Sequence, residues 1–355
     1  MRRALTILAL LATAGVLQAC ASAPDVMQYF PVGEAPGEAV VWPPEPATPR
    51  LEYVGLLIGD SNFTRAQGVQ DGAGVRFFRW VAGLGSGRPA ARHLVRPQSG
   101  VVDNRGRILI TDAGLQAVVV FDEVTAELSF WTEAGTGNTF LSPVGIGSRP
   151  NGEILVADAE LGIISVLASD GTPGQEFGAG ILQRPTGLAI DPLTGYTYVS
   201  DTVAHDIKVF DAGGSLVTTI GQRGTAPGEF NGPSHLSFSG GRLYVTDTFN
   251  ARVQVLTPDG QPIAGIGQQG LYVGNLVRPK GVTTDSDGNV YVVESYYDHL
   301  LVFDDNGNLL LPIGGAGREV GQFFLPSGVW SDSRNRIFVA DMFNGRIIML
   351  RYLGG

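Results

Sequence analysis

Four histidines are the side chains of this chain best suited to bind a metal ion or transfer a proton. His205 is followed by Asp206 and His299 is preceded by Asp298, so both stand beside a carboxylate. A catalytic zinc site needs three converging protein ligands and a structural site needs four. Whether the histidines converge depends on the elements that carry them. The four are His93, His205, His235 and His299.

A carboxylate recurs along most of the chain at nearly constant spacing. It stands at Asp112, Asp158, Asp201, Asp247, Glu294 and Asp341, with separations of 46, 43, 46, 47 and 47 residues. A proline keeps the same period at Pro97, Pro143, Pro185, Pro233, Pro279 and Pro326. A group needed in every repeat is architectural, and its expected task is to accept hydrogen bonds from the N–H groups of turns.

Each repeat contains four short apolar runs separated by turn residues. In the fourth repeat we expect strands over 233–239, 242–247, 252–256 and 261–266, with turns at Phe249 and at the Pro258-Asp259-Gly260 sequence. A period in the forties built from short strands is typical of β-propeller blades. The six repeats therefore predict an all-β, six-bladed β-propeller.

The repeat resembles a known family in the pattern Ile-Gly-x2-Gly-x3-Gly-x-Phe-x2-Pro. The pattern continues as Gly-x-Ile/Leu-Tyr-Val-x-Asp-x2-Asn-x-Arg-Ile/Val, which resembles the NHL repeat of six-bladed propellers, including bacterial lipoproteins. Asn250 with Arg252 and Asn344 with Arg346 match it. The other four repeats depart from it, with Leu115, Leu161, Ala204 and Tyr297 in place of Asn, and Ala117, Ile163, Asp206 and His299 in place of Arg. The resemblance implies the fold and leaves activity open.

The last repeat is incomplete, because it stops near Leu353 without an outer strand. Residues 51–59 form an unassigned strand pattern that ends in the same Ile-Gly pair as other outer strands. We predict that this N-terminal strand completes the last blade, which would leave no open edge in the ring.

The N-terminus predicts export and a lipid anchor. Residues 1–19 have two arginines and a short apolar run, as in a signal peptide. Leu17-Gln18-Ala19-Cys20 resembles the bacterial lipoprotein cleavage box, and Cys20 is the only cysteine. The resemblance implies a diacylglycerol thioether on Cys20, with acyl chains such as palmitate. Ala21 after the cysteine favours the outer membrane, facing the periplasm. The alternative is an ordinary leader cut after Ala19 or Ala21.

Two further segments flank the first strand of the propeller. Residues 20–50 carry the lipidated cysteine and a proline-rich tether, whose large side chains Tyr29 and Trp42 are expected to pack on the rim or to await a partner. The propeller then spans 51–355, with an insert at 60–83. In this insert Phe77, Phe78 and Trp80 predict either a flap over the rim or an exposed segment that contacts a partner or the membrane.

Enzymatic chemistry has one candidate position in the predicted channel. His235 stands two residues after the repeat proline, where four repeats have glycine, and is expected to face the central channel. The resemblance to peptide-amidating lyases would imply a zinc held by histidines from several blades, yet only one repeat supplies such a histidine. The gluconolactonase-like enzymes would require a Glu/Asn/Asp set, which is missing at the corresponding positions. We predict no catalytic residue, no metal ligand and no cofactor.

The composition narrows the possible partners. The chain has 24 basic and 34 acidic residues and a net charge of −10, so it would repel nucleic acid. We predict an envelope scaffold that binds a protein or peptide of unknown identity; the alternative is a metal-dependent lyase or hydrolase with its site in the channel. The candidate binding residues are His205, Asp206, His235, Tyr296, Tyr297, Asp298 and His299.

Overall fold

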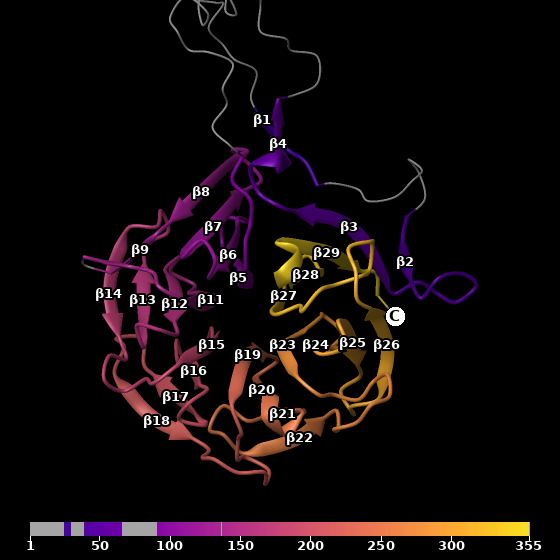
Figure 1. The fold of residues 1–355 in the computed structure, drawn as a ribbon. Coiled ribbons are helices and arrows are strands. Elements are labelled where there is room, and N and C mark those ends of the chain that lie inside the picture. Colours follow the sequence, from indigo (N-terminus) through magenta and orange to yellow (C-terminus); the bar gives the residue numbers. More distant parts are fainter. Residues whose placement is uncertain (1–24, 30–38, 66–90, 136, 355) are drawn as a thin grey trace, which may run out of the picture.

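The computed structural model describes residues 25–29, 39–65, 91–135 and 137–354. Six small antiparallel sheets stand in a ring around a central channel (Figure 1). The predicted six-bladed β-propeller is therefore confirmed. Five sheets have four strands, and the sixth has five.

Each blade runs from an inner strand at the channel to an outer strand at the rim (Figure 1). Blade one contains β5 (Pro97–Val102), β6 (Ile108–Asp112), β7 (Ala117–Asp122) and β8 (Glu127–Trp131). Blade two contains β11 (Pro143–Ser148), β12 (Ile154–Asp158), β13 (Ile163–Leu167) and β14 (Pro173–Phe177). Blade three contains β15 (Pro185–Ile190), β16 (Thr197–Asp201), β17 (Asp206–Phe210) and β18 (Leu216–Ile220).

The remaining blades keep the same order. Blade four contains β19 (Pro233–Ser239), β20 (Arg242–Asp247), β21 (Arg252–Leu256) and β22 (Pro262–Ile266). Blade five contains β23 (Pro279–Thr284), β24 (Val290–Glu294), β25 (His299–Phe303) and β26 (Leu309–Gly314). Blade six contains β27 (Val329–Ser331), β28 (Arg336–Asp341), β29 (Arg346–Tyr352), β3 (Leu51–Leu57) and β2 (Val41–Trp42).

The repeat proline begins the inner strand in five of the six blades. Proline has no N–H to give to a ladder, so the first residue of an edge strand is a position that tolerates it. The second and third strands carry β-branched and aromatic side chains on both faces and are almost entirely buried. Neighbouring blades therefore share their apolar faces, and the core lies between blades.

The ring is closed by the strand that precedes the first repeat. β3 pairs antiparallel with β29, and Leu57 lies opposite Ile347 while Leu51 lies opposite Tyr352. Both leucines are fully buried. The predicted closure is confirmed, and it joins the two ends of the propeller in one sheet.

Two pieces of the predicted tether also contact the propeller. β2 adds a fifth strand to blade six by pairing with β3, and Trp42 packs against the core between blades five and six. β1 (Asp25–Met27) pairs with β4 (Phe63–Arg65), and Tyr29 packs against the core between blades six and one. β2 covers the edge of β3, which would otherwise be open.

The first residues of the insert contact the residues that lead into blade one. The N–H of Asp60 donates to the carbonyl of Arg92 (2.9 Å), and its carboxylate accepts the N–H of Arg92 (2.7 Å). Asp60 begins the 3-10 helix η1 (Asp60–Asn62), where Ser61 Oγ lies 2.8 Å from His93 Nε2. His93 thus lies against the start of the insert.

The recurring carboxylate ties each blade together at one end. All six are buried, and each accepts an N–H from the residues just before its own inner strand. Asp158, for example, accepts from the N–H groups of Leu141 (2.8 Å) and Ser142 (3.0 Å), and from those of Glu160 and Leu161 in the following turn (both 3.0 Å). The predicted structural role of this acid is confirmed.

Candidate functional site: the connector face

The two broad faces of the disc carry different loops. The connectors between blades and the turns between second and third strands lie at one end of the strands, because the strands of each blade alternate in direction. We call this side the connector face. The turns that join first to second and third to fourth strands lie on the opposite face. His205 and residues 296–298 belong to connector-face turns, and His299 begins β25 at the same end.

His205 and Asp298 each join two blades. Both have a left-handed backbone, with φ of 61° and 56°, at the fourth position after the buried acid of their blade. His205 Nδ1 accepts the N–H of Gly232 (3.0 Å), and Asp298 Oδ1 accepts the N–H of Leu325 (2.6 Å). Each donor lies in the connector that leads into the next blade. This geometry gives both side chains an architectural task.

Asp206 follows His205 at the start of β17. One carboxylate oxygen pairs with Lys208 Nζ, and the other is buried without a hydrogen-bond partner among the described residues. The ion pair is local to one strand and stands apart from the other candidate residues.

His235 is buried at the connector-face end of β19. Its Nδ1 lies 3.2 Å from Ser234 Oγ, and its Nε2 has no hydrogen-bond partner in the described part of the chain. Burial and, after it, the charge of Lys280 lower the pKa of His235 to about 3. The imidazole is therefore neutral at physiological pH. It does not line the channel cavity, whose lining on this strand begins at Leu236.

The connector into blade five is held differently from those into blades four and six. In blade four, Asn250 Nδ2 donates to the carbonyl of Gly224 (2.8 Å), and Arg252 Nη2 donates to the carbonyls of Ala226 (2.9 Å) and Glu229 (3.0 Å). Asn344 and Arg346 make the corresponding bonds to the connector of blade six. In both blades the arginine also pairs with the buried aspartate.

Tyr297 and His299 occupy these two positions in blade five. Neither side chain makes a hydrogen bond to its connector within the described ranges, and a cavity of about 70 Å³ remains between them and residues 271–275. The N–H groups of Val277 and Arg278 still bond to Glu294. This connector is thus fixed at its end, but its middle lacks the two side-chain clamps.

The middle of this connector presents three consecutive large apolar side chains to solvent. Leu271, Tyr272 and Val273 are 81%, 83% and 63% exposed. Tyr296 is also exposed and meets Tyr297 edge-to-face with ring centroids 4.9 Å apart. Large apolar side chains are exposed in the corresponding loops all around this face: Val95, Leu141, Ile181, Val203, Phe249, Leu271, Tyr272, Val273, Tyr296, Phe324 and Phe343. We call this set the apolar patch.

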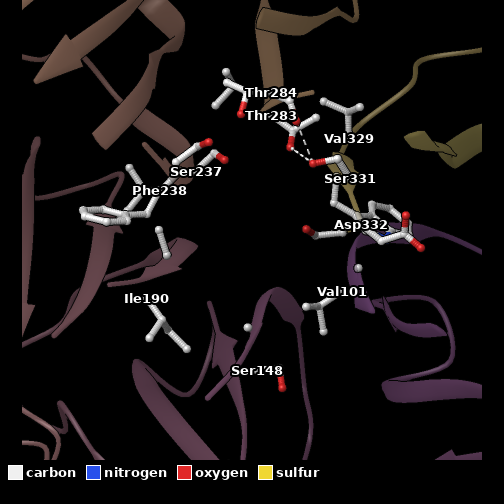
Figure 2. A pocket seen from close by; sticks show the side chains of 18 of the residues that line it. Val101, Ser148, Ile190, Ser237, Phe238, Thr283, Thr284, Val329, Ser331 and Asp332 are labelled. Atoms are coloured by element: carbon white, nitrogen blue, oxygen red, sulfur yellow. Dashed lines mark hydrogen bonds between the residues drawn. The ribbon is translucent and has the colours of Figure 1, made fainter. Parts of the chain in front are cut away.

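The channel opens on the opposite face as a cavity of about 420 Å³. Hydroxyl and apolar side chains from the inner strands surround it, as Figure 2 shows for Ser148, Ile190 and Ser237. Thr283 Oγ1 and Ser331 Oγ lie 3.0 Å apart, and Ser331 also donates to the carbonyl of Thr284 (2.8 Å). Sequence reasoning missed these residues. The available signal was the serine and threonine in the later half of four inner strands, β11, β19, β23 and β27.

The predicted anchor and docking residues lie outside the described ranges, and no group of metal ligands occurs within those ranges. Cys20 and the insert residues Phe77, Phe78 and Trp80 lie outside the described ranges. Within those ranges no group of three or more His, Cys, Asp or Glu could hold a metal ion, and no helix is long and apolar enough to cross a membrane. The four histidines lie on four different parts of the ring.

Comparison with known proteins supports the family of the repeat. The chain is 28% identical over 151 residues to NHL repeat-containing protein 3 of Homo sapiens. This match covers 40% of the chain and 42% of that protein, so the chain spans less than half of the relative. No protein-family model matches the sequence. The predicted resemblance to NHL-repeat propellers is thus confirmed.

Solved structures share the fold at low sequence identity. Virginiamycin B lyase from Staphylococcus aureus has a TM-score of 0.52 and 14% identity, over 73% of this chain and 96% of that one. An auxiliary nutrient binding protein from Bacteroides ovatus has a TM-score of 0.55 and 14% identity, over 72% and 69%. A lyase and a binding protein on one architecture show that the fold does not decide the function.

The low pKa of His235 predicts a specific dependence of stability on pH. The unfolded state takes up a proton near pH 6.5, whereas the folded state does so only near pH 3, so falling pH favours unfolding in this window by ~1.4 kcal/mol per pH unit. Between pH 7.5 and pH 4.5, urea unfolding of the wild type should lose about 2–3 kcal/mol more than that of the His235→Asn variant. Equal losses in both proteins would show that His235 is not buried as a neutral base.

Proposed function

We propose that this NHL-type propeller is a lipid-anchored protein of the bacterial envelope that binds a protein or peptide partner through the apolar patch of its connector face. The acyl chains on Cys20 would hold it at the outer membrane, on the periplasmic side. The partner would lie across several blades, as the radial placement of the patch favours.

The observation that carries this proposal is the exposure of Leu271, Tyr272 and Val273. Three consecutive large apolar side chains in water are unfavourable unless another surface covers them, and contiguous exposed apolar surface is typical of interaction sites. Their connector lacks the two clamps found in blades four and six, so it has more freedom to adapt to a partner. Tyrosine contributes large contact area with few rotatable bonds.

The distribution of apolar side chains supports the choice of face. The apolar patch has members in the connector-face loops of all six blades. The opposite face shows isolated ones, such as Val124 and Leu193, and the outer strands carry Leu216 and Val217. Scattered apolar residues are ordinary on a protein surface, whereas a set that occurs on one face in the loops of every blade calls for a common cause.

The enzymatic alternative has less support. A metal-dependent lyase or hydrolase needs converging ligands, and the described residues hold no such group. Among the described residues, His235 is the one histidine on an inner strand. Its imidazole is enclosed by the strand ends beside Ser234 and Lys280. The structural similarity to a lyase supports the propeller fold of this chain and gives no support for lyase activity.

The lipid anchor predicts a simple change of location. Replacing Cys20 by Ser removes the sulfur that would carry the diacylglycerol, so the protein should leave the membrane fraction and lose incorporation of a labelled fatty acid. Fractionation of cells that express each form measures this. The anchor is excluded if both forms stay in the membrane fraction and neither takes up label.

The partner surface is tested with two matched triple variants. Leu271→Ser, Tyr272→Ser and Val273→Ser together should reduce co-purification of envelope proteins about tenfold or more, because the exposed anchor side chains are lost. The control combines Leu216→Ser, Val217→Ser and Ile263→Ser on exposed outer strands. Quantitative mass spectrometry of material captured after cross-linking compares them with the wild type. An unchanged set of captured proteins in the first variant would contradict the proposal.

A further inference from the structure

The connector face carries a group of cations around the axis of the propeller. The residue before the repeat proline is arginine in three alternate blades, as Arg96, Arg184 and Arg278, and Lys280 follows the proline of blade five. The chain as a whole is acidic, with a net charge of −10. A local excess of positive charge on an acidic protein needs a separate explanation.

The three arginines are held in equivalent positions by the fold. The backbone N–H of each arginine donates to the buried acid of its own blade. Arg96 donates to Asp112 (3.0 Å), Arg184 donates to Asp201 (3.0 Å) and Arg278 donates to Glu294 (3.1 Å). The carbonyl of each arginine accepts an N–H from the turn after the same acid. The arginines directly precede β5, β15 and β23, and these inner strands stand around the axis on every second blade (Figure 1).

These cations have no ion-pair partner among the described residues. Arg184, Arg278 and Lys280 form neither a salt bridge nor a side-chain hydrogen bond there, and Arg96 makes a single long bond of 3.5 Å to the carbonyl of Ala113. The neighbouring carboxylates of Asp201 and Glu294 are buried and take up backbone N–H groups. Their negative charge offsets part of the positive charge of Arg184, Arg278 and Lys280, but these three side chains have no ion-pair partner among the described residues.

Lys280 of blade five is the one member of this group that is partly buried. Lys280 is half-buried, and burial, followed by the charges of Arg278 and Arg184, lowers its pKa. His235 lies on the adjacent inner strand, with a buried Nε2 that has no partner in the described structure. In the glycine-bearing blades the next inner strand comes within 3 Å of where a Cβ would stand, as at Gly187 and Gly281. His235 takes this position in blade four.

We propose that Arg184, Arg278 and Lys280, which lie around the axis on the connector face, bind a small ligand that carries several carboxylate groups. Lys280 is partly buried without a counter-ion, which is unfavourable, and a bound anion removes that cost. Arg184 and Arg278 are exposed and remain available to the same anion. Guanidinium groups bind carboxylates through paired N–H donors. Cations spread over several blades fit several carboxylates on one molecule better than one compact phosphate.

The inference goes beyond the partner surface and does not depend on it, since a small anion would occupy the axis while the apolar patch extends to the rim. The proposed anion site and the proposed partner surface can therefore be tested separately. Loss of anion binding leaves capture of envelope proteins by Leu271, Tyr272 and Val273 unchanged, and the converse also holds.

The test is calorimetric titration of the full chain in detergent with citrate, at pH 7.5 and constant ionic strength. Citrate should bind to the wild type, and the Arg184→Gln/Arg278→Gln variant should bind it about tenfold or more weakly, because each charged contact contributes strongly. The control variant Arg105→Gln/Arg242→Gln removes the same charge from the opposite face and should bind citrate as the wild type does. Inorganic phosphate should bind more weakly than citrate.

A second variant separates a ligand role from a structural one. Lys280→Met should lose citrate binding while its melting temperature without citrate stays the same or rises, because an unpaired, partly buried charge has been removed. No binding of citrate to the wild type, or equal weakening in the control variant, would overturn the proposal. Phosphate binding as tightly as citrate would overturn the assignment to a ligand with several carboxylates.

Discussion

A buried carboxylate at the end of each second strand is the interaction on which the rest of this structure depends. It accepts N–H groups from two places that are far apart in sequence, as Asp158 does from Leu141 and Ser142 and from Glu160 and Leu161. A charged acceptor makes stronger hydrogen bonds than a carbonyl, so one carboxylate holds both segments firmly. Each connector is thereby fixed where it enters its blade, and the loops of the connector face inherit that position.

Differences between the blades then decide where the disc can bind something. In blades four and six an asparagine and an arginine extend from the buried acid to the connector, which they hold by its carbonyls. Blade five keeps the acid, as Glu294, but has Tyr297 and His299 in place of the two clamps. The consequences are a small cavity and three exposed apolar side chains in the same connector. Function is thus expected where the repeat loses a structural bond.

The sequence predicts the fold because the pattern of one blade recurs six times along the chain. The period, the alternation of the strands and the incomplete last repeat are local patterns, and they lead to six blades, to the closing strand β3 and to a structural role for the recurring acid. A carboxylate that appears in every repeat can be assigned without a structure, because no single active site needs six copies.

The details of the site depend on contacts between blades, which have no local signal. His205 and Asp298 were candidates for binding because they are a histidine and an acid in turns, but the structure shows each accepting an N–H from the next blade. Their left-handed backbone angle recurs at the same turn position in every blade, but the distant donors Gly232 and Leu325 are brought to them by tertiary packing. The hydroxyls of the channel were missed for the same reason, since serine and threonine become a lining only when six strands meet.

The most direct test of this account is the free energy of unfolding of the Asp158→Asn variant, measured by urea denaturation. The amide keeps the shape of the side chain, but it replaces a charged acceptor of four backbone N–H groups by a neutral one and turns two donors toward them. The account predicts a loss of about 3 kcal/mol or more relative to the wild type. A loss below about 0.5 kcal/mol, within the range of ordinary surface substitutions, would contradict the claim that the recurring carboxylate holds the blades together.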